Sequence, residues 1–365
     1  MRILFIAYDI ASRLGGIQRF DQRVLRCLGE MQTTHGVTCT VLAFRDAPFT
    51  GPHQLQIRGF RRHKPHAFVG VLAHLLRGRY DLLLLDHVSL SPLCALVKLR
   101  APRVRTALFV HGVDVWDDRA YRRASRLEKC CCRHGLDRII AVSHYTARRM
   151  QQAYIIPPDR FSILPNAIDL DDAAQPASPV PLGSRILTVS RLDEWEKGIA
   201  QVIRALPLVV REIPDVQYVI AGDGILRPRL EQLARDCKVE SHVQLLGRVS
   251  DEQLVDLYRS SRLFIMPSQQ EGFGIVYLEA WKHCLPVIAG NRDAAIEVID
   301  DGINGLTVDP TSPHAIAHAI TRLLTNPTYA QQLGFAGHQK LCQHYHHERF
   351  HSQLEQILLS LSPHP

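Results

Sequence analysis

Long apolar runs are missing from this sequence of 365 residues. No stretch reaches the roughly 18–20 apolar residues that a helix needs to span a bilayer. The first nine residues hold one basic residue, a strand-length apolar run and an early acid, so they lack the long apolar region and cleavage site of a signal peptide. We therefore expect a cytoplasmic protein whose residues 1–9 contain the first strand of a Rossmann-like sheet.

A disulfide framework is absent as well. The chain has nine cysteines, an odd number, without the spacing of a disulfide scaffold, so we expect reduced thiols. Cys130, Cys131 and Cys132 are adjacent, but successive residues of a helix point about 100° apart and cannot converge on one metal ion. We interpret these three residues as buried or half-exposed free thiols.

Three ligand-binding signatures are also lacking. Gly15 and Gly16 follow the first expected strand, but their spacing is not the G-x-G-x-x-G of a dinucleotide site. Asp169 and Asp171 are better explained as a turn and a helix cap than as a metal-binding Asp-x-Asp loop. No nucleic-acid-binding module accompanies the basic residues. We therefore expect no bound metal, no cofactor and no nucleic-acid partner.

Positive charge is concentrated in the first half of the chain. Residues 1–170 contain 26 Lys and Arg against 13 Asp and Glu, whereas the remainder contains 17 against 23. A basic surface gains about 1 kcal/mol per Lys or Arg near anionic lipid headgroups, so our first interpretation is contact with a membrane surface. A solvated face ranks second and a nucleic-acid footprint a distant third. The clusters are Arg58, Arg61, Arg62 and Lys64; Arg77 and Arg79; Arg100, Arg103 and Arg105; and residues 122–133.

Apolar strand-length segments alternate with helical stretches along the whole chain. This alternation predicts an α/β protein with two doubly wound parallel sheets, each in a domain of ordinary size. The polar, proline-containing segment 171–183 is the best candidate for a linker between a domain of residues 1–170 and one of residues 184–345. The expected strands are 3–7, 37–44, 82–85, 106–110, 138–142, 161–164, 185–190, 217–221, 243–246, 263–266, 286–289 and 306–308.

The most informative stretch is 267–281, where the end of an apolar strand, 262–267, is followed by a glycine-containing loop and the start of an apolar helix. Glu271 lies in the loop and Glu279 about two turns further on. Ligands of open α/β sheets bind at the carboxyl ends of strands, and the N–H groups at a helix N-terminus attract phosphate. The simpler alternative is a strand-to-helix turn with an accidental pair of glutamates. The N–H groups at the start of the expected helix belong to Phe273, Gly274 and Ile275.

Two cations follow the expected strand 185–190. Arg191 and Lys197 could both reach an anion at the strand end, the first through a forked contact and the second as a point charge. A pair of ordinary surface cations near Glu194 and Glu196 is the alternative.

Several motifs, in order, resemble those of the retaining glycosyltransferases of family four. The Glu271 to Glu279 motif matches closely, and the resemblance spans nearly the whole chain. Each motif alone is weak, but their order and spacing together are specific. The other matching motifs are Gly15-Gly-Ile-Gln-Arg19, His111-Gly-Val-Asp114, Val142-Ser143, Pro165-Asn-Ala-Ile-Asp169, Ser190-Arg-Leu192, Lys197-Gly198, Ala221-Gly-Asp-Gly224 and Asp301-Gly-Ile-Asn-Gly305.

The resemblance implies the GT-B fold, with a nucleotide-sugar donor in the second domain and a C-terminal helix, residues 346–365, that packs back across the interdomain side. It implies that Glu279 binds the donor ribose and that Glu271 lies near the sugar. His111 is implied to approach the donor sugar from the acceptor domain, and Gly15 and Gly16 to face the diphosphate. Further residues implied to contact the donor are Arg191, Lys197, Arg248, Val249, Phe273, Gly274 and Ile275. Ser143 and Asn166 are weaker candidates, for which the alternative is that they only shape loops.

The resemblance further implies retention of anomeric configuration, by double displacement or by same-face attack. Because cations and helix dipoles can replace a metal at the diphosphate, we expect metal-independent transfer. We expect a peripheral enzyme on the cytoplasmic face of the membrane that moves a hexose from GDP-mannose or a UDP-sugar to a lipid-linked glycan, in surface polysaccharide or lipopolysaccharide assembly. The alternatives are a same-fold enzyme acting on a soluble small molecule, a nucleotide-sugar epimerase, and a nucleotide-sugar-binding module without turnover.

Overall fold

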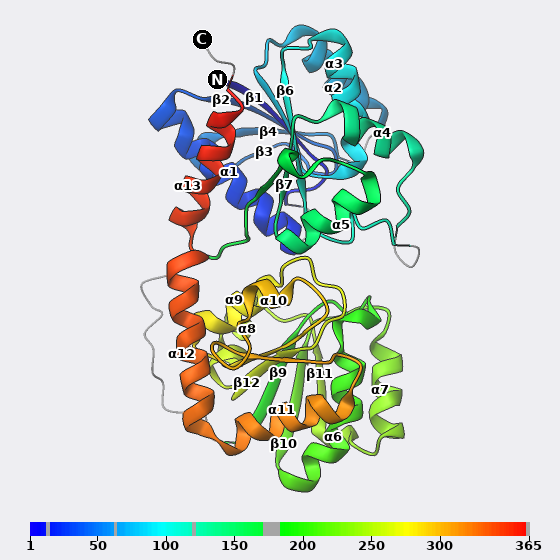
Figure 1. Cartoon of the computed structure of the whole chain (residues 1–365), viewed down its shortest axis with the longest axis vertical. Coiled ribbons are helices and arrows are strands. Elements are labelled where there is room, and N and C mark those ends of the chain that lie inside the picture. Colours follow the sequence, from blue (N-terminus) through cyan, green and yellow to red (C-terminus); the bar gives the residue numbers. More distant parts are fainter. Residues whose placement is uncertain (12–14, 62–63, 119–121, 171–182, 363–365) are drawn as a thin grey trace. The chain divides into compact units, whose positions relative to one another are not determined.

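The computed structural model describes residues 1–11, 15–61, 64–118, 122–170 and 183–362 (Figure 1). The chain forms two compact units, of which the first comprises Met1–Asn166 and His347–Pro365 and the second Ala167–His346. The expected linker, apart from Gly183, lies outside the described residues. Both units are α/β, as the alternating segments predicted.

The first unit is built on an eight-stranded sheet with the order β3-β4-β2-β1-β5-β6-β7-β8. Neighbouring strands pair in parallel except β3 and β4, which are antiparallel. The strands are β1 Arg2–Ala7, β2 Thr38–Ala43, β3 Phe49–Thr50, β4 Gln56–Gly59, β5 Leu82–Leu85, β6 Arg105–Val110, β7 Arg138–Ala141 and β8 Phe161–Ile163. The helices are α1 Gly16–His35, α2 Lys64–Arg77, α3 Pro92–Arg100, α4 Arg126–Gly135, α5 His144–Tyr154 and α13 His347–Ser360.

The C-terminal helix α13 belongs to the first unit, although it follows the second in sequence. Phe350, Leu354 and Leu358 recur every four residues along α13 and are buried, because that spacing places them on one helix face. The ring of Phe350 packs edge-on against Phe20 of α1, with 5.3 Å between centroids. The chain end is thereby held against α1, as Figure 1 shows for the red and blue helices.

The second unit contains a six-stranded parallel sheet with the order β11-β10-β9-β12-β13-β14. Its strands are β9 Ser184–Val189, β10 Val216–Ala221, β11 Val243–Gly247, β12 Leu263–Met266, β13 Val287–Gly290 and β14 Leu306–Val308. Its helices are α6 Ile199–Glu212, α7 Arg227–Asp236, α8 Asp251–Arg259, α9 Ile275–Lys282, α10 Ala295–Val298, α11 Pro313–Thr325 and α12 Pro327–His344. Helices α6 and α11 contribute Ile203 and Ile320 to a core with strand residues such as Ile186.

All twelve expected strands are present, with ends shifted by at most one residue. The sequence analysis missed β3 and β4, because the first has only two residues and the second contains a single buried residue, Ile57. All nine cysteines are free, with Cys130 exposed and its two neighbours buried. No helix in the described ranges has both the length and the hydropathy needed to cross a bilayer.

Candidate active site

In the second sheet, the order in which the chain adds strands reverses between β9 and β12. From β9 the chain proceeds outward through β10 and β11 on one side, and later through β12, β13 and β14 on the other. Loops that follow two such neighbouring strands diverge and leave a crevice at the carboxyl ends of the strands, where ligands of open α/β sheets bind. Lys197 follows β9 and Glu271 follows β12, so both lie at this switch point.

An ion-pair network joins the predicted residues at this edge. Lys197 Nζ lies 2.7 Å from Glu271 Oε2 and 3.7 Å from Glu194 Oε2. A guanidinium nitrogen of Arg191 lies 3.6 Å from the other oxygen of Glu194, and the Arg191 side chain is 71% exposed. Burial disfavours the charge on Lys197, but Glu271 and Glu194 outweigh it and raise its pKa. The lysine therefore remains cationic, and Arg191 adds a second positive group open to solvent.

Backbone contacts hold the two loops of this network together. Gly198 has φ 78°, and a Cβ atom there would lie 2.2 Å from the carbonyl oxygen of Pro267. The N–H of Gln269 donates to the carbonyl of Glu196 over 2.8 Å. Only glycine allows this close backbone approach at a left-handed position, so the Lys197-Gly198 sequence sets the separation of the lysine and Glu271 loops.

Helix α9 begins beside this network. Gly274 is its N-cap residue, with φ 88°, and a Cβ atom there would meet the ring of Tyr277 at 2.2 Å. The first N–H groups of a helix have no intrahelical acceptor, so those around Ile275 can serve an anion. The Phe273 side chain is buried against Tyr345, with 5.6 Å between ring centroids, so its expected role as a ligand contact rests on its backbone alone.

The remaining predicted donor residues lie apart from this network. Glu279 Oε2 accepts a hydrogen bond from the hydroxyl of Tyr258 over 3.0 Å, which fixes the carboxylate about one helical turn along α9. Arg248 and Val249 follow β11, where Arg248 is exposed and Val249 half-buried. Since β11 is the outer strand on one side, these residues are two strands away from Lys197.

Asp293 is a buried acid that the sequence analysis missed. It follows β13, and its Oδ1 accepts the Ala295 N–H over 2.9 Å. Burial raises the pKa of Asp293 to about 7, with nearby Glu271 adding to the effect. The available signal was its place directly after an expected strand, next to the loop of Glu271. The pKa of this carboxyl thus lies near neutral pH, and the carboxyl is at the same edge of the sheet as Glu271.

In the first unit, His111 follows β6. Its backbone N–H and that of Gly112 donate to Asp114 Oδ1 over 3.2 and 2.6 Å, and its ring packs edge-on against Phe20 at 4.9 Å. Burial lowers the pKa of His111 to about 4, and Asp114 only partly opposes this. The imidazole is therefore neutral at physiological pH, and one nitrogen of a neutral ring can accept a hydrogen bond or a proton.

Buried acids surround the switch point of the first sheet, between β1 and β5. Asp86 Oδ2 accepts the Tyr8 N–H over 2.7 Å, and burial raises the pKa of Asp86 to about 7. Burial and the neighbouring carboxyls of Asp86, Asp9 and Asp46 raise the pKa of Asp21 well above its ordinary value. Sequence reasoning missed this group, although three of its members follow expected strands.

Gly15 and Gly16 lie at the N-terminus of α1, which begins at Gly16. Gly15 is the N-cap residue in an extended conformation. The loop residues 12–14 between β1 and this helix are outside the described ranges. The structure thus places both glycines after the central strand of the first unit.

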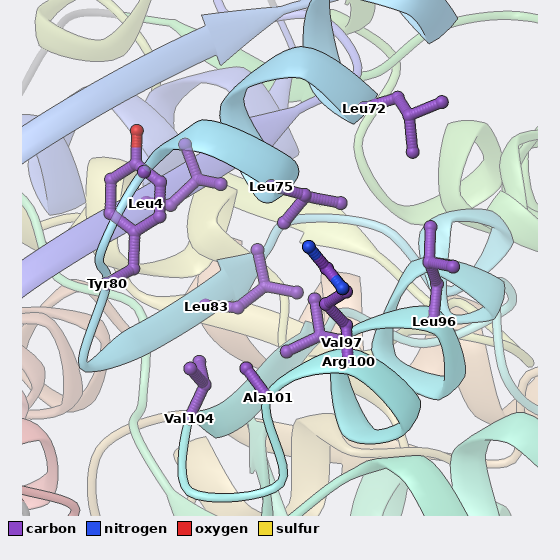
Figure 2. Close-up of a pocket in the computed structure, with 11 residues that line it drawn as sticks. Leu4, Leu72, Leu75, Tyr80, Leu83, Leu96, Val97, Arg100, Ala101 and Val104 are labelled. Carbon is purple, nitrogen blue, oxygen red and sulfur yellow. The ribbon is translucent and has the colours of Figure 1, made fainter.

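A small cavity of about 60 Å³ lies on one side of the first sheet, among β1, β5, α2 and α3 (Figure 2). Leu75, Leu83 and Leu96 line it, and Figure 2 shows the side chain of Arg100 beside them. Sites for small ligands usually exceed about 300 Å³. This cavity therefore has room for the end of an apolar chain but not for a nucleotide sugar.

The basic clusters of the first unit divide into two kinds. In the segment 122–133, Arg122 pairs with Glu128, Lys129 with Asp117, and Arg133 donates to the carbonyl of Tyr154, so these side chains stabilise the unit itself. Arg79, Arg100, Arg103 and Arg105 are exposed. Arg62 lies outside the described residues, as do the side chains of Lys64 and Arg77.

Comparisons with known protein families agree with this architecture. The model for "Glycosyltransferase Family 4" matches residues 15–172, and that for "Glycosyl transferases group 1" matches residues 176–340. The "GDP-mannose-dependent alpha-(1-6)-phosphatidylinositol monomannoside mannosyltransferase" of Mycolicibacterium smegmatis is 30% identical, with 92% of each chain covered. The Mycobacterium tuberculosis enzyme of the same name is also 30% identical, with 93% of each covered.

Solved structures support the fold at lower sequence identity. The Anabaena protein HepE in complex with UDP-glucose has a TM-score of 0.77 at 19% identity, covering 99% of this chain and 100% of that one. Sucrose-phosphate synthase from Thermosynechococcus elongatus has a TM-score of 0.81 at 20% identity, with 99% and 98% covered. Each unit is an α/β unit with a mostly parallel sheet, and the family models match both units. The chain therefore belongs to the family 4 glycosyltransferases, which have the GT-B fold.

Proposed function

We propose that this glycosyltransferase moves a hexose, with retention of anomeric configuration, from a nucleotide diphosphate sugar to a lipid-linked acceptor. The observation that carries the proposal is the pairing of Lys197 with Glu271 at the switch point of the second sheet, with Arg191 beside them. A sugar nucleotide needs positive charge at its diphosphate and hydrogen-bond acceptors at its sugar. This edge supplies both within one network.

The cations act on the leaving group. As the glycosidic bond breaks, the diphosphate gains negative charge, and fixed donors placed there lower the barrier. Lys197 and Arg191 supply charge, and the N-terminus of α9 around Ile275 supplies N–H groups and the positive end of the helix dipole. In this proposal Lys197 also holds Glu271 in position for the sugar hydroxyls, and Glu279, oriented by Tyr258, accepts hydrogen bonds from the ribose.

The first unit is proposed to bind the acceptor. His111 is neutral because of its burial, so it can accept or share a hydroxyl hydrogen bond without repelling a cationic neighbour. Asp86, with a pKa of about 7, is a further candidate for contact with acceptor hydroxyls. Retention by same-face attack or by double displacement through a carboxylate would both use Glu271 close to the sugar.

GDP-mannose is the first donor to test. Both mycobacterial relatives are described as GDP-mannose-dependent, whereas the Anabaena structure of similar fold was solved with UDP-glucose. The sequence identity with the mannosyltransferases extends over both units, which favours mannose over glucose. The phosphatidylinositol mannoside named in the same relatives favours a lipid-linked acceptor.

The proposed membrane contact lies around α3. Leu99 is 85% exposed and stands next to the exposed Arg100, with Arg103 shortly after. An exposed leucine beside cations suits the boundary between headgroups and acyl chains. The adjacent cavity that Leu96 and Arg100 line could take the end of an acyl chain. This contact would place the enzyme peripherally on the cytoplasmic face of a membrane.

We also propose that transfer needs no metal, because Lys197 and Arg191 neutralise the diphosphate. The test is the transfer rate in chelator, with and without added Mg²⁺ or Mn²⁺. Full activity in chelator would support the proposal, and loss of activity restored by one divalent ion would contradict it.

The function is tested by transfer itself. The purified chain is incubated with GDP-mannose or UDP-sugars, together with phosphatidylinositol and its monomannoside in vesicles or with soluble sugars. We expect a mannosylated lipid whose new linkage has the anomeric configuration of the donor. Glycosylation of soluble sugars alone would favour the small-molecule enzyme, whereas conversion of the donor sugar without an acceptor would favour an epimerase. Donor binding without any product in all these mixtures would favour the binding module.

A further inference from the structure

Helices α1 and α13 bring four side chains with metal-binding groups together in the first unit. Cys27 and Glu30 lie three residues apart on α1, and His347 and His351 lie four residues apart on α13. Both spacings put the two members of each pair on one face of their helix. The imidazole rings of the two histidines are nearly parallel, with centroids 6.2 Å apart.

The carboxylate of Glu30 is the centre of this group. Its Oε1 accepts a hydrogen bond from Arg26 Nε over 3.1 Å. Its Oε2 lies 3.2 Å from His347 Nε2 and 3.7 Å from His351 Nε2. Its Oε1 also lies 3.3 Å from His347 Nε2 and 3.7 Å from His53 Nε2. The Sγ of Cys27, a carboxylate oxygen of Glu30 and a ring nitrogen of His351 all lie within 4.8 Å of one another.

We propose that Cys27, Glu30, His347 and His351 form a structural Zn²⁺ site that fastens the C-terminal helix to α1. Cysteine sulfur, histidine nitrogen and carboxylate oxygen are the ligands that zinc takes in tetrahedral sites. Ligand atoms about 2.0–2.3 Å from a tetrahedral zinc lie about 3.3–3.8 Å from one another. The separations of His347 Nε2 and His351 Nε2 from Glu30 Oε2, 3.2 and 3.7 Å, fall in or close to that range. The Cys27 sulfur lies within 4.8 Å of Glu30 and His351, so the side chains of Cys27 and His347 must shift to complete the tetrahedron.

The charges of the group also suit a divalent ion. Binding removes the proton from the Cys27 thiol and leaves a thiolate, a carboxylate and two neutral imidazoles, which together balance Zn²⁺. Cys27 is buried, and His351 Nε2 is buried without a hydrogen bond among the described residues. A zinc ion would satisfy this nitrogen. The mixed sulfur and nitrogen ligands favour zinc over Mg²⁺ or Ca²⁺, which prefer oxygen.

The proposed role of the metal ion is to stabilise the packing of α13 against α1. Helix α13 follows the whole second unit in sequence, yet it packs in the first unit through residues such as Phe350. A metal ion bound by both helices adds a tie at the start of α13, where the chain returns. None of its four residues is among those proposed for transfer, so its test is metal content and not enzyme activity.

The test measures zinc in the full-length protein after any affinity tag has been removed. We expect about one Zn²⁺ per chain by elemental analysis, and a sulfur-to-metal charge-transfer band when Co²⁺ replaces zinc. Cys27→Ala should abolish that band. His351→Gln should weaken metal affinity by about tenfold or more, and both variants should lose the rise in melting temperature that Zn²⁺ gives the parent protein.

Cys130→Ala and His134→Gln are the matched controls, because both residues are exposed on α4 of the same unit. They should bind metal like the parent protein. His351→Gln guards against misfolding of the Cys27 variant. His351 is partly exposed, and its Nε2 makes no hydrogen bond to the described residues, only the 3.7 Å contact with Glu30. A parent protein that binds no Zn²⁺ or Co²⁺, or variants that retain the bound metal, would overturn the proposal and leave an ordinary hydrogen-bonded contact.

Discussion

At the carboxyl edge of the second sheet, Lys197 and Arg191 share the carboxylates of Glu194 and Glu271 and remain partly open to solvent. At the corresponding edge of the first sheet, Asp21 and Asp86 are buried among further acids. The net charges of the two halves of the chain are opposite in sign to the charges at these edges. Residues 1–170 carry a twofold excess of Lys and Arg over acids, and the remainder carries an excess of acids.

This contrast indicates that local placement, and not net charge, decides what each edge can bind. A cation held between two carboxylates can exchange one of them for a diphosphate at little cost, whereas buried acids repel an anion and suit hydroxyl groups. In the proposed function, the same architecture therefore serves two different tasks. The predictions below test this division between a donor edge and an acceptor edge.

The largest effect is expected when the proposed donor edge loses Lys197, whose side chain is 18% exposed. Lys197→Met removes the charge that faces the leaving diphosphate and the partner that holds Glu271, so transfer should fall by roughly 100–1,000-fold. The measurement is kcat/KM with the best donor. Lys282→Met, at the far end of α9, is the control and should stay within about twofold of the parent enzyme.

A smaller loss is expected at the ribose. Glu279→Ala should weaken donor binding by about 10–100-fold, because hydrogen bonds to a charged group contribute about 1.5–3 kcal/mol. Calorimetry with the sugar nucleotide measures this, and Glu231→Ala on α7 is the matched control. Unchanged donor affinity in the Glu279 variant would remove this residue from the proposed site.

Asp293 tests whether a buried acid at the donor edge lowers the stability of the folded protein when the acid ionises. Because its pKa is raised to about 7, the folded state binds this proton more tightly than the unfolded state, where the carboxyl has its ordinary value. Stability should therefore fall as pH rises from about 4 to about 7, by up to about 1.4 kcal/mol per pH unit. Asp293→Asn keeps an acceptor for Ala295 and should remove this slope. Denaturant unfolding at several pH values tests this, and an identical slope in both proteins would contradict it.

The smallest effect per residue is expected at the membrane contact. Arg100→Glu should weaken binding to anionic vesicles by a few kcal/mol at most, since each basic residue contributes about 1 kcal/mol and the change reverses the charge. Leu99→Ser should also reduce vesicle binding. Both variants should retain donor binding. Arg204→Glu, in the second unit, should leave vesicle sedimentation unchanged.

Much of the fold followed from sequence pattern, because buried parallel strands such as β5 and β12 are short apolar runs. The network of Lys197 and Glu271 was also accessible, since both residues follow expected strands. The edge strands β3 and β4 were missed because they bury few side chains. The acids around Asp21 were not predicted, because nothing in the local sequence around α1 shows that its carboxyl is buried beside Asp86. The α1 and α13 group joins residues more than 300 positions apart, a distance that no local pattern spans.

The proposed function depends above all on binding of a sugar-nucleotide diphosphate at the switch point of the second sheet. The most direct measurement is calorimetric titration of the parent protein and of Lys197→Met with a panel of GDP-, UDP-, ADP- and dTDP-sugars. We expect tight binding of the sugar nucleotide with one particular base, GDP-mannose being the first candidate. The affinity of the Lys197→Met protein for it should be lower by at least about tenfold. Equal affinity in both proteins, or no binding to any member of the panel, would contradict the proposed function.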